Sequence, residues 1–497
     1  MKHGGEILEK KSNVVIVTIA VFVASFMSAI EGTIVSTAMP TIVGDLHGVS
    51  IMNWIFSIYL LTNAIATPIY GKLSDTIGRK KVLVFGLSVF IIGSTLSGLS
   101  ESMGTLIMWR AVQGIGAGAI MPVTFTIIAD IYPFEKRAKV LGFNGASWGI
   151  ASIVAPLIGG FIVDQLTWHW IFFINVPIGI IVIALIIIFH HETFVPRKTK
   201  MDYQGSLWLS VTLLAIMYIF QMLSETTINW FMVVGTFVLA IITGYLFIRR
   251  EKRVSYPIIP LELFKDRTFV TQNLVAALIS GYLIGFDVYI PMWAQGIKGL
   301  PATIAGFALA PSSIMWMVGS FIAGKLLLSL TPKRVVMISL TIILIGSAIF
   351  ALFPYSTGFG WFYLVAAICG TGFGITITTT TVTVQNEVSA KDIGIATSLN
   401  TLSRTLGQTL MVSVFGIVLN VTMAKGVNSH QSTSMSMMNK LINPKTATDL
   451  QEKLLPILRH ILYQGIHYVF ILGVCLILIA FVTNWFDRPE IKQDKLE

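Results

Sequence analysis

Long apolar runs separated by short polar connections make up most of this 497-residue chain. A run of about 20 residues is the length at which an α-helix crosses the ~30 Å hydrocarbon core of a bilayer. The ten-residue alternating pattern of a membrane β-barrel does not occur. The runs predict fourteen spanning helices, at residues 13–38, 51–71, 82–99, 104–131, 141–163, 168–190, 204–223, 228–248, 269–295, 303–328, 334–353, 358–385, 394–421 and 464–486.

Composition and charge are those of a membrane protein. The chain is 55% hydrophobic and 12% charged, with a mean hydropathy of +0.80, well outside the range of soluble domains. The net charge of +10 does not indicate nucleic-acid binding, because the basic residues lie in short loops. Of the 34 Lys and Arg residues, 26 fall at the termini and in the loops on their side. The positive-inside rule therefore predicts a multi-pass cell-membrane protein with both termini in the cytoplasm.

A weak internal repeat relates the two ends of the chain. Gly71-Lys72-Leu73 followed by Lys80-Lys81-Val82 recurs as Gly324-Lys325-Leu326 followed by Lys333-Arg334-Val335, at the same internal spacing. Each copy follows the second span of a six-span set. Repeats of this kind are typical of secondary transporters, whose binding site lies between the two halves.

The repeat also predicts the domain organisation. We expect an N-terminal six-helix half in residues 1–200, two extra linker spans in 201–250 and a C-terminal six-helix half in 251–497. The C-terminal half contains the long external loop, residues 422–463. Within it, residues 446–462 have helical apolar spacing and are expected to lie along the outer membrane surface.

Four charged residues lie well inside apolar runs, away from the ends, where an ionisable side chain costs roughly 3 kcal/mol or more. Glu31 in the first span and Arg110 in the fourth both lie about 10 Å from the outer ends of their helices. Asp287 lies about as far along the ninth span as Glu31 does along the first. It is either a second protonation or cation-contact site or an acid hydrated near the outer mouth. Arg404, near mid-depth, is assigned a structural role, in which it pairs with an acid or holds helices together.

The loop after the second span has a pattern that membrane topology alone does not explain. A basic run at 79–81 suits any cytoplasmic loop, but that rule does not require the glycines and the aspartate that precede it. The loop resembles the signature loop of the major facilitator superfamily. By this resemblance a conformational latch for the outward-facing state is formed by Gly71, Asp75, Gly78, Arg79 and Asp130.

Further motifs extend the resemblance over nearly the whole chain. Residues 110–118 are similar to the second motif of the superfamily, and residues 148–160 to the motif that marks its exporters. Ala155 stands where the exporter motif usually has glycine. With residues 168–179 and 260–264, these stretches resemble the fourteen-span drug:proton antiporters. The helix-kink motif within them consists of Ala155, Pro156, Gly159 and Gly160.

The resemblance implies an all-α polytopic protein with the major facilitator fold, in which two pseudo-symmetric six-helix halves are joined by two extra central helices. In that fold the first and fourth spans line a central cavity, so Glu31 and Arg110 are expected to pair. The alternative is that Arg110 extends to the outer surface. The first-span pattern of the family usually has aspartate where this chain has Glu31, and glutamate retains the carboxyl group. The proton-coupling residues implied are Glu31, Arg110 and Asp287.

A central cavity of this kind suits amphipathic organic molecules. Large, mostly apolar pockets with few polar anchors bind such ligands, and aromatic faces together with carboxylates favour cations. The candidate substrate-binding residues are Glu31, Trp54, Gln113, Phe125, Trp148, Tyr289, Trp293, Thr379 and Asn400.

The sequence therefore predicts a proton-coupled exporter of hydrophobic, cationic drugs, dyes or biocides that works by alternating access, with Glu31 as the main proton-coupling carboxylate. The alternative is an exporter of a physiological lipid, amino acid or metabolite on the same fold. An enzyme or nucleotide-driven pump is not expected, because Gly71-Lys72 is followed by leucine instead of Ser or Thr. We expect a bacterial monomer in the lipid bilayer with no cofactor, no metal and no nucleic-acid partner.

Overall fold

The structure, a computed structural model, describes residues 12–132, 140, 150–151, 154–192, 202–223, 228–254, 261–388, 393–430 and 432–487. All regular structure in these residues is helical. Thirteen of the described helices are long and apolar enough to cross a membrane. Of the predicted span 141–163, residues 141–149, 152 and 153 lie outside the described residues, and the shorter apolar helix Val154–Gln165 begins within its described part. The all-α membrane architecture is as predicted.

The helices follow the predicted spans. In chain order they are α1 (Val14–Leu46), η1 (Val49–Ile51), α2 (Asn53–Ile77), α3 (Arg79–Gly98), α4 (Met103–Ile131), α6 (Trp170–Phe173), α7 (Asn175–Phe189), α8 (Tyr203–Leu223), α9 (Trp230–Glu251), η2 (Leu261–Lys265), α10 (Arg267–Met292), η3 (Trp293–Ile297), α11 (Ala302–Phe307), α12 (Ala310–Leu326), α13 (Pro332–Leu352), α14 (Gly360–Asn386), α15 (Ile393–Asn428), α16 (Met435–Ile442), α17 (Pro444–Ala447) and α18 (Leu455–Trp485). Hydropathy underestimates the lengths of α1, α15 and α18 because these helices continue past their most apolar stretch.

Glycine triplets fix the helix spacing in the same way in both halves. In each triplet the first and third glycines pack against the second long helix of the half, α2 or α12, and the middle glycine packs against α3 or α13. A Cβ atom at any of the six positions would overlap with atoms of the neighbouring helix. Small residues thus allow the helix backbones to approach closely. The six positions are Gly114, Gly116 and Gly118 in α4, and Gly370, Gly372 and Gly374 in α14.

Lys80 and Lys333, which correspond in the sequence repeat, also make corresponding contacts. Lys80 Nζ donates to two carbonyl oxygens at the end of α7, both at 2.7 Å. Lys333 Nζ donates to two carbonyl oxygens at the end of α18, both at 2.9 Å. The last carbonyls of a helix lack intrahelical donors and carry partial negative charge, so a cation there is favourable. Lys80 thus links α3 to the end of α7, and Lys333 links α13 to the end of α18.

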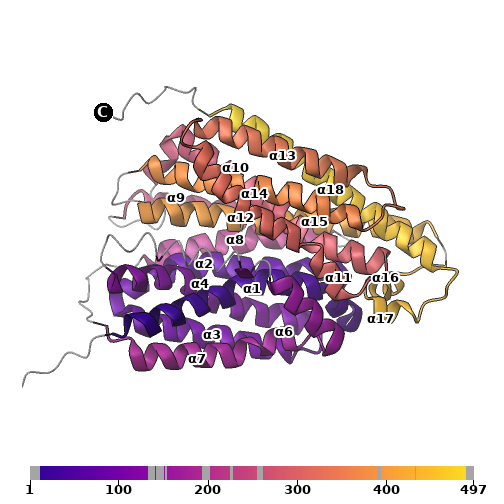
Figure 1. The fold of residues 1–497 in the computed structure, drawn as a ribbon, viewed down its shortest axis with the longest axis horizontal. Helices are drawn as coiled ribbons and strands as arrows, with labels where there is room; N and C mark the ends of the chain where they lie inside the picture. The colour runs from indigo at the N-terminus through magenta and orange to yellow at the C-terminus, as the bar shows by residue number, and fades with distance from the viewer. Residues whose placement is uncertain are drawn as a thin grey trace, which may run out of the picture.

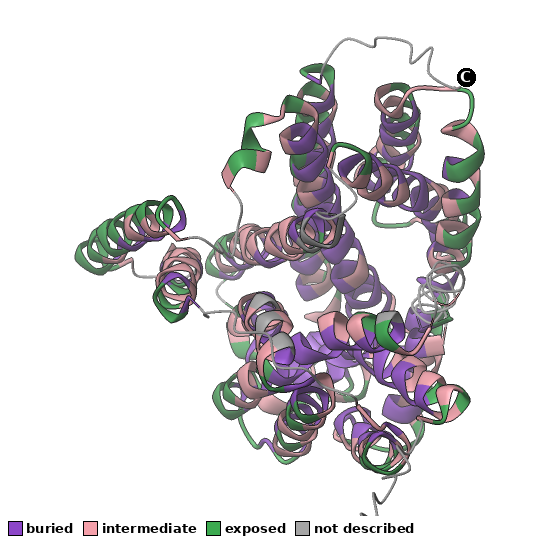
Figure 2. Cartoon of the chain, turned by 90° about the vertical axis from the view of Figure 1, so that its left-hand side faces the viewer, coloured by how far each residue is buried: buried purple, intermediate pink, exposed green. Residues whose placement is uncertain are grey.

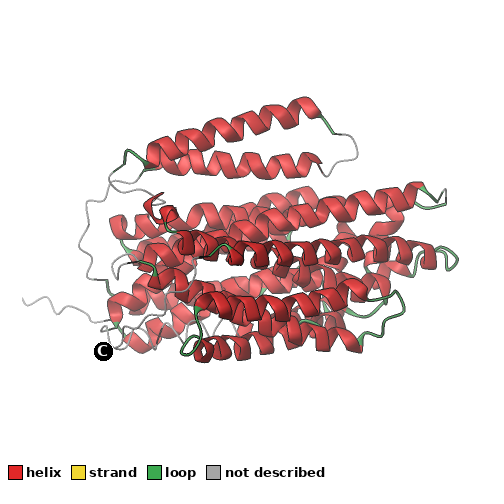
Figure 3. Cartoon of the chain, turned by 90° about the horizontal axis from the view of Figure 1, so that it is seen from above, coloured by secondary structure: helices red, strands yellow, loops and turns green. Residues whose placement is uncertain are grey.

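Helices α8 and α9 form a pair beside the main bundle (Figures 2 and 3). They are joined by a hydrogen bond of 2.8 Å between the hydroxyls of Thr212 and Thr243 and by an ion pair of 3.1 Å between Asp202 and Arg250. Helix α8 packs against α2 and α15, one helix from each half. Much of α9 is apolar and exposed, as befits a surface that faces lipid. The predicted boundary at residue 200 lies outside the described residues.

The connection between α15 and α18 is shorter than expected and contains α16 and α17. Helix α15 continues to Asn428 and α18 begins at Leu455. The expectation that residues 446–462 lie along the outer membrane surface was wrong for residues 455–462. Residues 455–462 form the first two turns of α18, and both Leu458 and Leu462 are fully buried. An apolar stripe on a helix packs as well against other helices as against lipid, and periodicity alone does not distinguish the two.

The two halves meet at the end of the bundle that carries α11, α16 and α17 (Figure 1). We call this end the loop side, and the opposite end, where α1 begins and α18 ends, the terminal side. The hydrogen bonds between the halves that can be traced among the described residues lie on the loop side. They join Thr37 to Gln295, Val49 to Asn439, Ser50 to Asn420, Asn53 to Tyr289, Ser57 to Ser413, Val163 to Lys445 and Asp164 to Thr303.

Candidate functional site

A buried ion pair lies inside the N-terminal half. Glu31 of α1 and Arg110 of α4 are both completely shielded from solvent. Arg110 Nη1 donates a hydrogen bond to Glu31 Oε1. Burying either charge alone in this position would carry a large desolvation free energy, and the opposite charge of the partner offsets that cost. Arg110 therefore lies in the protein interior and does not extend to the outer surface.

Three further contacts hold the guanidinium group of Arg110. Its Nη1 also donates to Gln113 Oε1 at 2.8 Å, and its Nε donates to the carbonyl oxygen of Ile55 at 3.3 Å. The guanidinium carbon lies 4.2 Å from the centre of the Tyr59 ring, within cation–π distance. Gln113, a candidate substrate-binding residue, thus uses its carbonyl oxygen on Arg110, while its Nε2 has no partner among the described residues.

Asn175, the first residue of α7, binds the second carboxylate oxygen. Asn175 Nδ2 lies 2.8 Å from Glu31 Oε2 and 3.0 Å from Ser94 Oγ in α3. The carboxylate is therefore held from α4 and α7 together. Sequence reasoning missed Asn175, because an asparagine two residues before a proline at the start of a span has no pattern that points to a carboxylate 144 positions away.

The C-terminal half has no such pair at the corresponding positions. By the spacing of the sequence repeat, Ile284 corresponds to Glu31, and by the spacing of the glycine triplets, Ala366 corresponds to Arg110. Asp287 lies three residues beyond the position that corresponds to Glu31, so the similarity in their depth is approximate. The charge pair is a feature of the N-terminal half.

Asp287 in α10 and Arg404 in α15 are both half-buried, and neither has a hydrogen bond or ion pair with another residue in the described part of the chain. Helices α10 and α15 pack side by side, with Gly281 against Met411. Counted along α10 from Gly281, Asp287 lies six residues towards the loop side. Counted along α15 from Met411, Arg404 lies seven residues towards the terminal side. They are separated by about 20 Å along the helix axes and do not pair with each other. The structural role of Arg404 stays a prediction.

Three of the aromatic candidates lie in different surroundings. The hydroxyl of Tyr289 donates to Asn53 Oδ1 at 3.2 Å, across the contact between the halves. Trp54, half-buried, is the residue after Asn53 on the same helix. Trp293 is fully buried within the C-terminal half, where its ring lies 5.3 Å from that of Phe362. Trp148 lies outside the described residues.

The polar candidates of the C-terminal half are engaged in helix packing or fully enclosed. Asn400 Nδ2 donates to Asn273 Oδ1 and its Oδ1 accepts from the hydroxyl of Thr381, both at 3.1 Å. Thr379 is fully buried. Phe125 in α4 is partly exposed. A contact between any of these side chains and a substrate stays a prediction.

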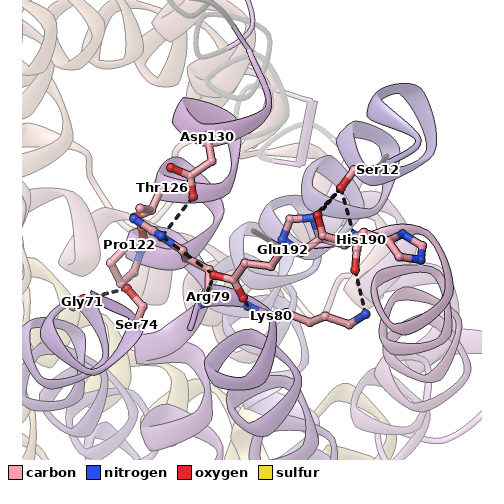
Figure 4. A network of polar contacts seen from close by, with 11 residues as sticks. Ser12, Gly71, Ser74, Arg79, Lys80, Pro122, Thr126, Asp130, His190 and Glu192 are labelled. Carbon is pink, nitrogen blue, oxygen red and sulfur yellow. Dashed lines mark hydrogen bonds and ion pairs between the residues drawn. The ribbon is translucent and has the colours of Figure 1, made fainter. Parts of the chain in front are cut away.

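The predicted latch residues Arg79 and Asp130 form an ion pair on the terminal side, with Nε and Oδ2 3.0 Å apart (Figure 4). Both residues belong to the N-terminal half, so this contact by itself does not join the halves. Gly71, within α2, accepts a hydrogen bond of 2.7 Å from the Ser74 hydroxyl through its carbonyl oxygen. The side chain of Asp75 lies outside the described part of the structure. The latch function stays a prediction.

Glu192 belongs to the same terminal-side cluster but was not foreseen. Its carboxylate accepts hydrogen bonds from the backbone N–H groups of Arg79 and Lys80 at 2.7 and 3.1 Å (Figure 4). These are free amides of the first turn of α3, where negative charge is favourable. Gly78 precedes them with φ of 103°, a conformation that favours glycine. A glutamate after an apolar span carries no sequence signal for this role.

The predicted helix-kink motif lies at the contact between the halves. Within Val154–Gln165, Gly159 packs against Ile34 of α1, and Gly160 packs against the backbone of Thr303 in α11. A Cβ atom at Gly160 would overlap with that backbone. The small residues of this motif thus allow one helix of the N-terminal half to approach the C-terminal half closely.

Comparison with known proteins agrees with this architecture. The family model described as Major Facilitator Superfamily matches residues 21–412. Multidrug resistance protein 3 of Bacillus subtilis (strain 168) is 33% identical over 490 residues, which cover 96% of each chain. Multidrug transporter protein MdtP of the same organism is 31% identical over 513 residues, which cover 97% of this chain and 94% of that protein.

Solved structures are similar in fold. A crystal structure of a bacterial homolog to the human lysosomal transporter Spinster, in an inward-facing and unoccupied conformation, matches 95% of this chain and 96% of its own with a TM-score of 0.67. The sequence identity is 16%, so the likeness concerns the fold alone.

Proposed function

This chain belongs to the major facilitator superfamily, and we propose that it is a proton-coupled antiporter that exports hydrophobic organic cations such as drugs, dyes or biocides. Two relatives, a multidrug resistance protein and a multidrug transporter, support this class of cargo. The protein acts as a monomer in a bacterial cell membrane, without a cofactor and with both termini in the cytoplasm. Glu31 is its main proton-coupling carboxylate.

The buried Glu31–Arg110 pair carries this proposal. Replacing a buried ion pair by apolar residues of similar volume is often neutral or stabilising, so such a pair is weak evidence for a stabilising role. The C-terminal half has Ile284 and Ala366 at the corresponding positions and keeps the same glycine packing. The fold therefore does not require the charges, and a transport function explains why the N-terminal half contains them.

Proton binding at Glu31 changes the charge that a substrate meets. With Glu31 ionised, the pair with Arg110 is neutral overall. With Glu31 protonated, the guanidinium of Arg110 remains as an uncompensated positive charge. At a separation of about 8 Å and an effective dielectric constant of about 20, two unit charges repel by about 2 kcal/mol. Protonation thus favours release of a cation, and deprotonation favours its capture.

Asp287 supplies the second carboxylate of the proposal. Each carboxylate oxygen of Glu31 accepts a hydrogen bond from a protein donor, whereas Asp287 is half-buried and forms no hydrogen bond or ion pair with any described residue. An unpaired acid within a span is a functional candidate by default. We assign Asp287 either direct contact with the cation or a second protonation.

Alternating access supplies the movement. The hydrogen bonds that join the halves in the described part of the chain lie on the loop side, which is the outer side if the termini are cytoplasmic. The described arrangement then corresponds to a state closed towards the outside. Export requires these contacts to break while contacts form on the terminal side. The Arg79–Asp130 cluster is the proposed latch of that second state.

A proteoliposome assay tests the coupling. Purified protein is reconstituted, ethidium is supplied outside, and an acidic lumen is imposed. We expect inside-out wild-type protein to accumulate the dye as protons leave the lumen. Glu31→Gln, which cannot ionise, is expected to lose the response to the proton gradient. Glu101→Gln, at an exposed loop-side acid, is the matched control and is expected to behave as wild type.

The outcomes separate the components of the proposal. Full gradient-driven accumulation by Glu31→Gln would show the coupling assignment to be wrong. If Asp287→Asn keeps coupling to the proton gradient but binds the dye more weakly, Asp287 contacts the cation. If Asp287→Asn loses that coupling, Asp287 binds a second proton. A wild-type protein that moves no organic cation, but moves a lipid or amino acid under the same gradient, would favour the alternative cargo.

A further inference from the structure

We propose that Asn175 is a positioning residue that orients the Glu31 carboxylate and is the contact released when Glu31 takes up a proton. The inference rests on the proposed function, because it assumes that Glu31 carries the proton. It adds a role for α7, and for its junction with α6, in the response to that proton.

Asn175 stands where three helices of the N-terminal half meet. Its side chain is 2% exposed. Its Nδ2 lies 2.8 Å from Glu31 Oε2 of α1 and 3.0 Å from Ser94 Oγ of α3. The Ser94 hydroxyl in turn donates to the carbonyl oxygen of Phe172 in α6 at 2.8 Å. The chain of hydrogen bonds thus runs from the carboxylate through α7 and α3 to α6.

The direction of these hydrogen bonds fixes which end of the amide faces the carboxylate. A serine hydroxyl has one proton, and Ser94 uses it on the Phe172 carbonyl oxygen. Ser94 therefore accepts from Asn175, so the NH2 group of Asn175 points towards Ser94. The second hydrogen of that NH2 group points to Glu31 Oε2. The flipped amide, with its oxygen facing an ionised carboxylate, is excluded by the same pattern.

Both carboxylate oxygens of Glu31 consequently face donors, Arg110 at Oε1 and Asn175 at Oε2. This arrangement satisfies the ionised form. A protonated carboxyl carries an O–H group that needs an acceptor, and at this site the added proton competes with an N–H donor for the same oxygen. The hydrogen bond from the charged guanidinium is the stronger of the two. Asn175 is therefore the donor that withdraws.

The position of Asn175 in the chain allows that movement. It is the first residue of α7, directly after the turn at Ile174 that separates α6 from α7. The charged or titratable groups that act on Glu31 from the packed helices are Arg110 of α4 and Tyr59 of α2. Helices α3 and α7 contribute the neutral groups of Ser94 and Asn175. Release of the Asn175 hydrogen bond is thus the step that couples protonation of Glu31 to the position of α7.

The test is the pH dependence of dye transport in proteoliposomes. Asn175→Leu removes the donor at similar volume, so the ionised carboxylate loses a stabilising hydrogen bond. We expect the pH of half-maximal proton-driven transport to rise by about one unit, a tenfold change in proton concentration. Asn175→Gln keeps an NH2 donor and is expected to restore part of the shift. Asn484→Leu, at a buried asparagine of the C-terminal half, is the matched control and should leave the midpoint unchanged.

Difference infrared spectroscopy supplies a second measurement that does not depend on transport. The protonated-carboxyl band that Glu31→Gln abolishes is followed against pH in wild type and in Asn175→Ser. A rise of its midpoint in Asn175→Ser supports the inference. An unchanged transport midpoint in Asn175→Leu, or an unchanged band in Asn175→Ser, overturns it while the proposed function stands. If Glu31→Gln keeps full coupling, the proposed function fails instead.

Discussion

Asp164 of the N-terminal half binds Thr303 of the C-terminal half and thereby joins the halves on the loop side. The Asp164 carboxylate accepts from the backbone N–H of Thr303 at 2.9 Å, from its hydroxyl, and from the N–H of Ala302 at 3.1 Å. Among the interhalf hydrogen bonds described above, this contact alone uses a carboxylate. Charge-assisted hydrogen bonds are the stronger kind, so the contact is a principal element of loop-side closure.

Removing that carboxylate should favour opening on the loop side. For Asp164→Ala we expect a loss of about 2 kcal/mol from the closed state, or a roughly 30-fold change in the ratio of closed to open molecules. Spin labels at the exposed loop-side residues Leu99 and Leu352 report the separation of the halves. Thr303→Val removes one donor only and should produce a smaller shift. An unchanged distance distribution in Asp164→Ala would contradict the assignment.

The Glu192 cap on α3 should contribute to the stability of the terminal side. Glu192→Ala leaves two backbone N–H groups at the start of α3 without their acceptor. We expect a loss of about 1–2 kcal/mol, seen as a lower midpoint of thermal unfolding in detergent. Glu101→Ala, at an exposed acid on the loop side, is the control. Equal midpoints for the two variants would argue against the cap.

The glycine triplets should tolerate no side chain. In Gly116→Ala the new Cβ atom would overlap with the backbone of Phe90 in α3, so we expect a large loss of folded protein. Gly235→Ala, where a Cβ atom meets nothing within 4 Å, is the matched control and should gain roughly 0.5–1 kcal/mol from helix propensity. Size-exclusion profiles of the two variants check both expectations. A normal profile for Gly116→Ala would refute tight packing of α4 on α3.

Protonation of His190 should destabilise the terminal side in acid. Burial lowers the pKa of His190 below its usual 6.5, and although Glu192 opposes this shift, Lys80 adds to it. The unfolded chain therefore binds a proton at a higher pH than the folded one. The stability contributed by the neutral side chain is present above about pH 6.5 and is lost as the pH falls towards the lower pKa of the folded state.

The measurement is the unfolding temperature of detergent-solubilised protein at pH 7.5 and 5.5. We expect a smaller decrease on acidification in His190→Gln than in wild type. His430→Gln, at an exposed loop-side histidine, should show the wild-type decrease. The assignment fails if His190→Gln and wild type decrease equally.

The sequence determined the features that depend on single residues or short runs. Whether a run enters the bilayer follows from the transfer free energy of its side chains, which is additive along the chain. Thirteen of the predicted spans were therefore located among the described residues, although helices such as α18 extend beyond their most apolar part. The cost of a charge in a span is equally local, so Glu31, Arg110 and Asp287 were recognised. The repeat of Lys80 at Lys333 was likewise visible in the sequence.

Only the tertiary structure decided which of these side chains meet. Asn175 is 144 residues from Glu31, and Glu192 is 113 residues from Arg79. Such contacts depend on how helices rotate and pack, and many side chains of one helix satisfy the same hydropathy pattern in any rotation. Glu31 and Asp287 are alike in the sequence as acids at similar depth. Packing brought Glu31 into contact with Arg110 and Asn175 and left Asp287 without a partner among the described residues.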